Sequence, residues 1–218
     1  FMKTRSFCGV LLFLLLLLNV EKIGSQNVGD WCSWTGVTIN HRITPVIRVM
    51  SKMEVRTKDN ISDFERFFIN AGLGYKILPE WELKGVLAYH RRNSVSKGDF
   101  NAYRYHIGSE VSWRKGGFRI QWRERFQHTF ALGDGEMIVR SRLKFDYNVP
   151  STILSPYFAV ETFNDIESDD FFKADRIRYT PGMRFKLNGM YSVSVFYCLQ
   201  DDRIRKSNIA GVELFINL

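Results

Sequence analysis

The sequence has little cysteine and, beyond its N-terminal segment, no long apolar run. Three cysteines among 218 residues, of which Cys32 and Cys198 lie after residue 25, are too few for a disulfide framework. After residue 25, charge interrupts every apolar stretch within a few residues, which excludes a spanning helix of about 20 apolar residues. There is no Pro/Ser-rich linker, so the length fits one domain. If this chain crosses a membrane, it must do so as a closed β-barrel, because lipid leaves no water for unpaired backbone groups.

The first 25 residues predict a secretory signal peptide. Lys3 and Arg5 precede the apolar run from Val10 to Leu18, and the small residues Gly24 and Ser25 follow it. The run is shorter than the ~20 residues that a membrane anchor needs. We therefore expect export, removal of residues 1–25, and a mature domain of residues 26–218.

A two-residue alternation dominates the rest of the chain. From Tyr103 to Arg114, and again from Met137 to Tyr147, aromatic or aliphatic residues alternate with charged ones. Side chains alternate across a strand, so each run predicts a ribbon with one apolar and one charged face. These ribbons are longer than ordinary strands of about five or six residues and suit transmembrane strands of about nine to eleven.

The pattern predicts an all-β fold, an antiparallel transmembrane β-barrel of about 10–12 strands. Bacterial barrels have an even number of strands with both ends on one side. A count of eleven candidates therefore means either that a strand has been missed or that the 31–40 segment does not complete the wall. Strand candidates lie near 31–40, 44–57, 64–77, 81–92, 101–114, 118–131, 136–147, 156–163, 174–187, 190–200 and 207–218.

The connections between these candidates are expected to alternate in length. Short turns at 41–42, 79–80, 115–117 and 188–189 contrast with longer polar segments at 58–63, 93–100, 164–173 and 201–206. Short turns on one side and long external loops on the other are typical of outer-membrane barrels. The residues beside the short turns predict an interfacial aromatic girdle: Tyr75, Trp81, Trp113, Phe118, Phe145, Tyr147, Phe185 and Tyr191.

The charged face is the main candidate for function, because in a barrel it lines the lumen. The formal charge is +8 for the whole chain; without the three basic and one acidic residues of 1–25, 28 basic and 22 acidic residues leave +6. The face predicts either an interlocked ion-pair network filling a narrow barrel, which we favour, or an anion-preferring pore. The lumen candidates are Arg48, Arg104, Glu110, Arg119, Arg123, Arg125, Arg140, Arg142, Glu161, Arg176, Arg178 and Arg184.

Three further residues stand out along the strands. His90 and His106 share the polar parity of adjacent strands, and a hairpin folded symmetrically about residue 98 would place them opposite each other. Paired imidazoles can bind metal or move protons, but a plain polar pair is the favoured interpretation, with no metal or cofactor expected. Glu124 falls on the apolar parity, which predicts either a β-bulge or a position near the headgroups.

Several short motifs carry a family resemblance. They are Asp30 to Trp34, the alternating Tyr103-Arg104-Tyr105 with Arg119 to Arg125, Pro156 to Phe163, Arg176 to Gly182, and Val195-Phe196-Tyr197. Over roughly Trp31 to Leu218 the chain resembles the domain of unknown function 2490 family of outer-membrane proteins, found largely in Bacteroidetes. The resemblance implies an outer-membrane barrel and supplies no catalytic residue or ligand.

Together these features predict an integral outer-membrane barrel with a charged, ion-paired lumen and a structural or surface role. A small anion channel, a lipid-modifying enzyme and a soluble lipocalin-like barrel are the alternatives. No G-x-S-x-G motif accompanies the histidines, so enzymatic activity is not expected. The expected partners are outer-membrane lipid, the barrel assembly machinery, which would read the apolar C-terminal strand 207–218, and an anionic solute. Nucleic acid is not expected.

Overall fold

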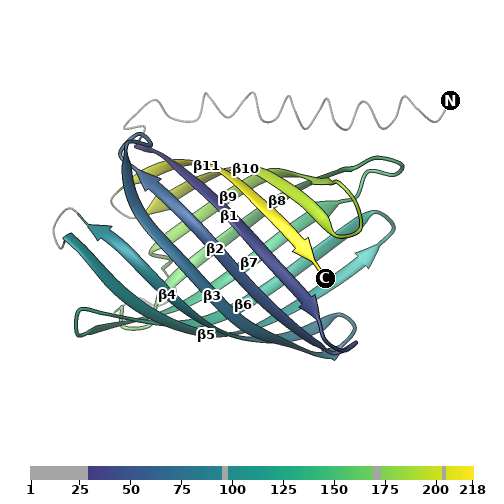
Figure 1. The fold of residues 1–218 in the computed structure, drawn as a ribbon, viewed down its shortest axis with the longest axis horizontal. Helices are drawn as coiled ribbons and strands as arrows, with labels where there is room; N and C mark the ends of the chain where they lie inside the picture. Colours follow the sequence, from purple (N-terminus) through teal and green to yellow (C-terminus); the bar gives the residue numbers. More distant parts are fainter. Residues whose placement is uncertain (1–28, 95–97, 169–172, 203–204) are drawn as a thin grey trace.

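The computed structural model describes residues 29–94, 98–168, 173–202 and 205–218, which form one closed barrel (Figure 1). This confirms the predicted all-β barrel, with eleven strands in the described part. The predicted signal peptide, residues 1–25, lies outside the described residues. Among the described residues, no helix has the length and apolar character needed to cross a membrane. The strands are β1 (Trp31–Arg42), β2 (Ile47–Lys58), β3 (Asp63–Leu78), β4 (Trp81–Ser94), β5 (Gly98–Lys115), β6 (Phe118–Ala131), β7 (Asp134–Tyr147), β8 (Leu154–Asp165), β9 (Arg176–Lys186), β10 (Tyr191–Asp202) and β11 (Lys206–Asn217).

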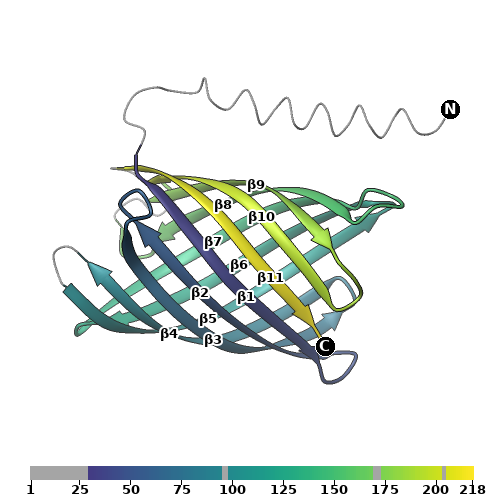
Figure 2. The same cartoon turned by 45° about the horizontal axis from the view of Figure 1, so that its top comes forward.

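The barrel closes through a parallel pair. β1 lies beside β11, with Trp31 opposite Asn208 and Asn40 opposite Asn217 (Figures 1 and 2). The other neighbouring pairs of the described barrel are antiparallel. An odd number of alternating strands makes the first and last run the same way, so the 31–40 segment completes the wall after all. We call the end where β1 and β11 begin the N-terminal rim and the end where they finish the C-terminal rim.

The two faces of the wall follow the sequence alternation. On β5, the side chain of Ile107 points outward and is 62% exposed, whereas the neighbouring His106 points inward and is 7% exposed. The apolar side chains Leu73, Leu87, Trp122 and Val195 are likewise exposed on the exterior. Charged residues occupy the interior, the opposite of what a soluble lipocalin-like barrel requires.

Aromatic rings gather on the exterior near both rims. Tyr75, Trp81, Trp113 and Phe118 are exposed near the C-terminal rim, and the rings of Phe118 and Tyr147 lie 4.5 Å apart between centroids. Near the N-terminal rim, Trp31 packs with Tyr197 and Tyr89 with Tyr103, at centroid distances of 6.2 and 5.7 Å. The sequence had indicated the first of these groups and not the second.

The expected alternation of short turns and long loops was largely wrong. The C-terminal rim carries the connections 43–46, 79–80, 116–117, 148–153 and 187–190, and the N-terminal rim carries 59–62 and 132–133. The strand ends at the N-terminal rim are also joined by 95–97, 166–175 and 203–205, of which residues 95–97, 169–172 and 203–204 lie outside the described part. Only the connection 166–175 is clearly longer than the others. The ends of the expected loops 58–63 and 93–100 belong to hairpin ladders, because Lys58 pairs with Asp63 and Asn93 with Asp99. Backbone pairing continues there whatever the polarity of the side chains.

Glu124 faces outward near the middle of β6, and neither explanation expected for it holds. Its register with Ser109 on β5 and Ser141 on β7 is regular, without a bulge. The carboxylate accepts hydrogen bonds from Trp122 Nε1 and Ser141 Oγ, each at 2.6 Å. The exterior therefore holds one internally bonded carboxylate within an apolar belt.

A small apolar cluster lies inside the closing seam. It contains Cys32 and Trp34 of β1, Ile209 of β11 and Cys198 of β10, with Phe196 packed against it. Cys32 and Cys198 each pair with Ile209 from opposite sides, so a whole strand separates them. Both are buried free thiols, and their separation by a strand is too large for a disulfide.

Candidate functional site: a basic lumen

The barrel encloses a cavity of about 670 Å³ along most of its length. Its lining extends from Arg119 and Asn217 near the C-terminal rim to Arg92 and Arg176 near the N-terminal rim. A second cavity of about 170 Å³ shares Arg48 and Glu110 with the first and continues among the connections 43–46 and 79–80. The internal space thus reaches towards both rims.

Every lumen candidate from the sequence lines this cavity, as do His90 and His106. The candidate set was confined to Arg and Glu and omitted lysines of the same inward parity, which the alternation could have identified. Five acidic side chains line the cavity: Glu54, Glu110, Glu136, Glu161 and Glu213. Sixteen basic ones do: Arg48, Lys52, Arg56, Arg66, Lys84, Arg92, Arg104, Arg119, Arg123, Arg125, Arg140, Arg142, Lys144, Arg176, Arg178 and Arg184.

Glu161 of β8 is the centre of the largest ion-pair group. Its carboxylate lies 2.6 Å from Arg123 Nη2, 3.0 Å from Arg140 Nη2 and 4.0 Å from Arg178 Nη1. The guanidinium groups of Arg140 and Arg178 also stack over the Phe163 ring, at 4.3 and 4.5 Å. One buried acid therefore forms ion pairs with three cations.

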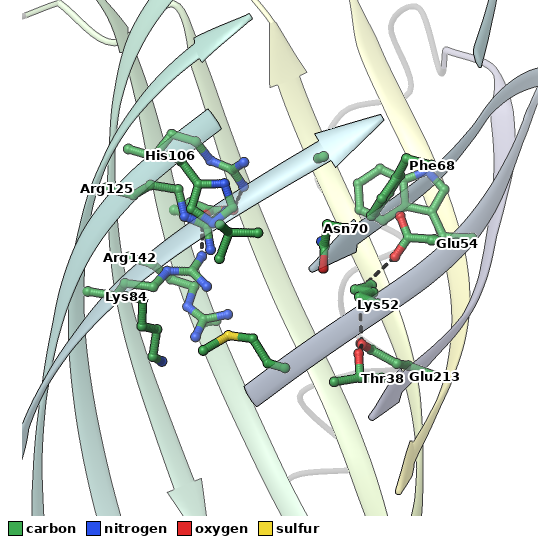
Figure 3. A pocket seen from close by; sticks show the side chains of 18 of the residues that line it. Thr38, Lys52, Glu54, Phe68, Asn70, Lys84, His106, Arg125, Arg142 and Glu213 are labelled. Atoms are coloured by element: carbon green, nitrogen blue, oxygen red, sulfur yellow. Dashed lines mark hydrogen bonds and ion pairs between the residues drawn. The ribbon is translucent and has the colours of Figure 1, made fainter. Parts of the chain in front are cut away.

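The opposite wall, formed by β1, β2 and β11, is internally paired. Lys52 Nζ lies 2.7 Å from Glu54 and 2.9 Å from Glu213, whose carboxylate also accepts a 2.5 Å hydrogen bond from Thr38 Oγ1 (Figure 3). Arg56 Nε donates to Glu54 at 2.6 Å. The basic side chains Lys52 and Arg56 on this wall are therefore neutralised by acids of the same wall.

Other ion pairs lie towards the C-terminal rim, and most of them join different strands. Arg48 contacts Glu82 at 2.6 Å, and Lys84 contacts Glu110 at 2.9 Å. Asp146 accepts from Arg119 at 3.2 Å and from Lys144 at 3.0 Å, both through their terminal nitrogens. Towards the N-terminal rim, Arg176 pairs with Asp202. These contacts connect strands through side chains as well as through the backbone.

Several cations have no acid to pair with among the described residues. Arg104 donates only to the hydroxyl of Thr129, at 2.8 Å, and the guanidinium of Arg184 lies over the Phe215 ring at 4.5 Å. Arg125 makes no hydrogen bond or ion pair within the described chain. Figure 3 shows Arg125, His106, Arg142 and Lys84 on one wall, facing the paired wall of Lys52, Glu54 and Glu213. The basic excess is therefore concentrated on β4 to β7.

The histidines do not face each other, so the expected geometry was wrong. His90 is opposite Ala102 and His106 is opposite Val86. The β4–β5 hairpin begins its pairing at Ser94 and Gly98, which centres it on residue 96 and not on 98. His90 instead contacts the Phe68 ring at 5.2 Å between centroids. The described residues contain no group of three or more His, Cys, Asp or Glu that could hold a metal ion.

Comparison with known proteins agrees with this architecture. The profile of the family described as "Protein of unknown function (DUF2490)" matches residues 31–209. The chain belongs to the DUF2490 family. No curated protein matches it.

Two solved structures are similar to this DUF2490 barrel. The translocator domain of the autotransporter NalP from Neisseria meningitidis matches at a TM-score of 0.51 and 11% identity, over 74% of this chain and 72% of that one. The siderophore receptor PirA from Pseudomonas aeruginosa matches at 13% identity over 74% of this chain and 32% of that one. Its TM-score of 0.27 supports no inference. The first likeness shows a shared barrel fold.

Proposed function

We propose that this DUF2490 protein is an integral outer-membrane barrel whose lumen accepts and passes small anions. The exterior supports the location. Strands of 11 to 18 residues carry an apolar outer face with aromatic rings near both rims, as outer-membrane barrels do. The barrel assembly machinery would insert the protein, and the apolar outer face would then contact lipid.

The observation that carries the anion preference is the charge of the cavity lining. Sixteen basic and five acidic side chains line a space of about 670 Å³. Glu65, Glu82, Asp146 and Asp202 neutralise some of the basic ones from outside this lining, and a basic surplus still remains. Removing an ion from water costs several kcal/mol unless a counterion or water compensates. A lumen with this surplus attracts anions and repels cations, as rings of Arg and Lys do in anion pores.

A purely structural barrel is the second candidate, and the contacts of Glu161 favour it. Arg123 and Arg140 reach this acid from two other strands, so their ion pairs stiffen the wall from within. An eleven-stranded barrel is also narrower than porins of 16 to 18 strands. Neither role assigns the protein a catalytic step.

Planar-bilayer recordings separate the two candidates. Purified protein refolded in detergent is added to a bilayer under a tenfold KCl gradient, and the reversal potential is measured. We expect single-channel steps with a reversal potential of the sign given by chloride selectivity. Correctly folded protein that gives no conductance steps would reject the channel in favour of the structural role. A reversal potential of the sign given by cation selectivity would contradict the proposed anion preference.

The location needs its own test. The protein should fractionate with outer membranes, require detergent for solubility, and change gel mobility on boiling, because a closed barrel resists unfolding by cold detergent. Recovery as a detergent-free periplasmic monomer would overturn the membrane assignment.

A further inference from the structure

The inner faces of β5, β6 and β7 place like charges directly opposite each other. Arg125 of β6 is the register partner of Arg140 of β7, and Arg123 is the partner of Arg142. Like charges directly opposite on a sheet are destabilising. The Arg123 and Arg140 charges are compensated by Glu161, at 2.6 and 3.0 Å, while Arg142 has Glu110 at 3.9 Å. Arg125 alone of these four has no acid, although it lines the cavity.

Two inward-facing residues of β5, His106 and Arg104, likewise form no ion pair with an acid among the described residues. Among the described residues, Arg104 donates a hydrogen bond only to Thr129. His106 is 7% exposed, and its buried Nδ1 has no hydrogen-bond partner there. The register places His106 opposite Gln127, two residues from Arg125 on β6, and Arg104 opposite Thr129, two residues further. Figure 3 shows His106 and Arg125 together on one wall of the cavity.

The backbone leaves room for a ligand beside Arg125. Its partner on β5 is Gly108, so no side chain covers the guanidinium from that strand. A Cβ at Gly108 would lie 2.8 Å from the carbonyl oxygen of Glu124, closer than packing allows. The close approach of β5 and β6 at this point therefore requires glycine, and it keeps the inner surface open there.

The unsatisfied polar atoms of the lumen are all of one kind. Among the described residues, each buried side-chain polar atom without a hydrogen-bond partner is a nitrogen, on arginine, histidine or Trp34. Buried donors need acceptors, and leaving one unpaired costs free energy. A ligand rich in acceptor oxygens matches the arginine and Trp34 nitrogens, which are donors, and the one protonated nitrogen of each neutral imidazole.

We propose that Arg104, His106 and Arg125 form a binding site for a compact oxyanion, a phosphate or carboxylate group, on the wall of the lumen. The inference rests on the proposed anion-accepting lumen and names its solute class and its place. Planar guanidinium groups bind carboxylate and phosphate oxygens through parallel hydrogen bonds, which a monatomic halide cannot receive in the same way. The cavity volume limits the solute to a small molecule bearing that group.

Isothermal titration of the refolded protein in detergent tests the site, with inorganic phosphate and succinate as separate probes at constant ionic strength. Phosphate should bind saturably, and Arg125→Gln should weaken it by about tenfold or more, since the lost contact is charge-assisted. Arg184→Gln removes an unpaired lumen charge that lies over Phe215, away from the site, and should change the affinity by less than about threefold. The tighter of the two probes identifies the oxyanion.

Equal weakening by both substitutions would mean a diffuse positive potential and would overturn the site, as would the absence of saturable binding to folded protein. If Arg125→Gln does not fold, Arg125→Lys keeps the charge without the planar fork and should still weaken binding. Unchanged affinity in that variant counts against the proposal. Reversal potentials of the same variants keep the two proposals separate: anion selectivity without saturable phosphate binding rejects this site only, and binding without conductance rejects the channel only.

Discussion

Glu161 of β8 lies 2.6 Å from the guanidinium of Arg123 on β6, across the inner face of the intervening strand β7. Strands β6 and β8 share no backbone hydrogen bonds, because β7 lies between them. The ion pair therefore links them through the lumen, in addition to the hydrogen bonds between adjacent strands. Arg140 and Arg178 approach the same carboxylate. Three buried cations on three strands therefore share a single acid.

Truncation of that acid gives the first prediction. Glu161→Ala should lower the free energy of unfolding by about 3–5 kcal/mol, because it leaves buried guanidinium groups without a counter-charge. Thermal or urea unfolding in detergent micelles measures the loss. Glu136→Ala is the matched control, since Glu136 lines the cavity at its exposed N-terminal rim, and it should be nearly neutral. An unchanged melting curve for Glu161→Ala together with altered ion selectivity would show that water screens these charges.

Adjacent residues on β7 test which face meets lipid. Val139→Arg places a charge on the apolar exterior and should cost about 2–4 kcal/mol if it sits at the bilayer midplane, which impairs assembly. Arg140→Val changes the inner face and should interfere less with insertion, although it removes one partner of Glu161. The yield of heat-modifiable barrel in outer membranes measures both. Equal tolerance of the two substitutions would contradict the face assignment.

Glu124 allows a third test, on the exterior. Glu124→Gln keeps an acceptor oxygen for Trp122 and an amide group that can hydrogen-bond Ser141. Because it also removes a charge from the apolar exterior, the free energy of unfolding should be unchanged or higher. Glu124→Leu leaves the Trp122 and Ser141 donors unpaired and should lower stability by about 1–3 kcal/mol. Urea midpoints in lipid vesicles compare the two. A more stable Leu variant than Gln variant would mean that the hydrogen bonds contribute nothing.

The orientation in the membrane follows from the longest connection, 166–175, because long loops of outer-membrane barrels face outward. In a background with Cys32 and Cys198 replaced by alanine, Glu167→Cys should react with an impermeant maleimide on intact cells. Glu80→Cys, in a two-residue turn at the other rim, should react only after the cells are opened. The reverse pattern would invert the topology.

The sequence predicted the wall better than the connections. Alternation assigned Ile107 outward and His106 inward correctly, because period-two polarity follows directly from strand geometry. It misplaced the centre of the β4–β5 hairpin by two residues, since polar residues such as Asn93 continue a ladder as readily as they form a loop. That shift is what separated His90 from His106.

Two other features depend on contacts between distant segments. Nothing in the local pattern of 31–42 indicates a parallel partner about 175 residues away, because strand direction and closure are properties of the whole sheet. Likewise, the alternation identified Arg125 and Arg140 as inward-facing, but only the register shows that they lie opposite each other. The side-chain contacts then show that Glu161 pairs with Arg140 and not with Arg125. Charge pairing in a barrel is therefore read from the register, after the strands are known.

The parallel junction of β1 and β11 has a consequence for how the protein can be attached to other things. In a barrel with an even number of strands, the first strand begins and the last strand ends on the same side of the membrane. Tags joined to the two ends of such a barrel therefore lie on the same side. Here β1 and β11 point the same way, so Trp31 and Asn217 lie at opposite rims of the barrel. In the proposed membrane location, a reporter joined ahead of Trp31 and one joined behind Asn217 would emerge into different compartments. A single molecule of this fold could thus tether one structure on each side of a bilayer without any additional spanning segment.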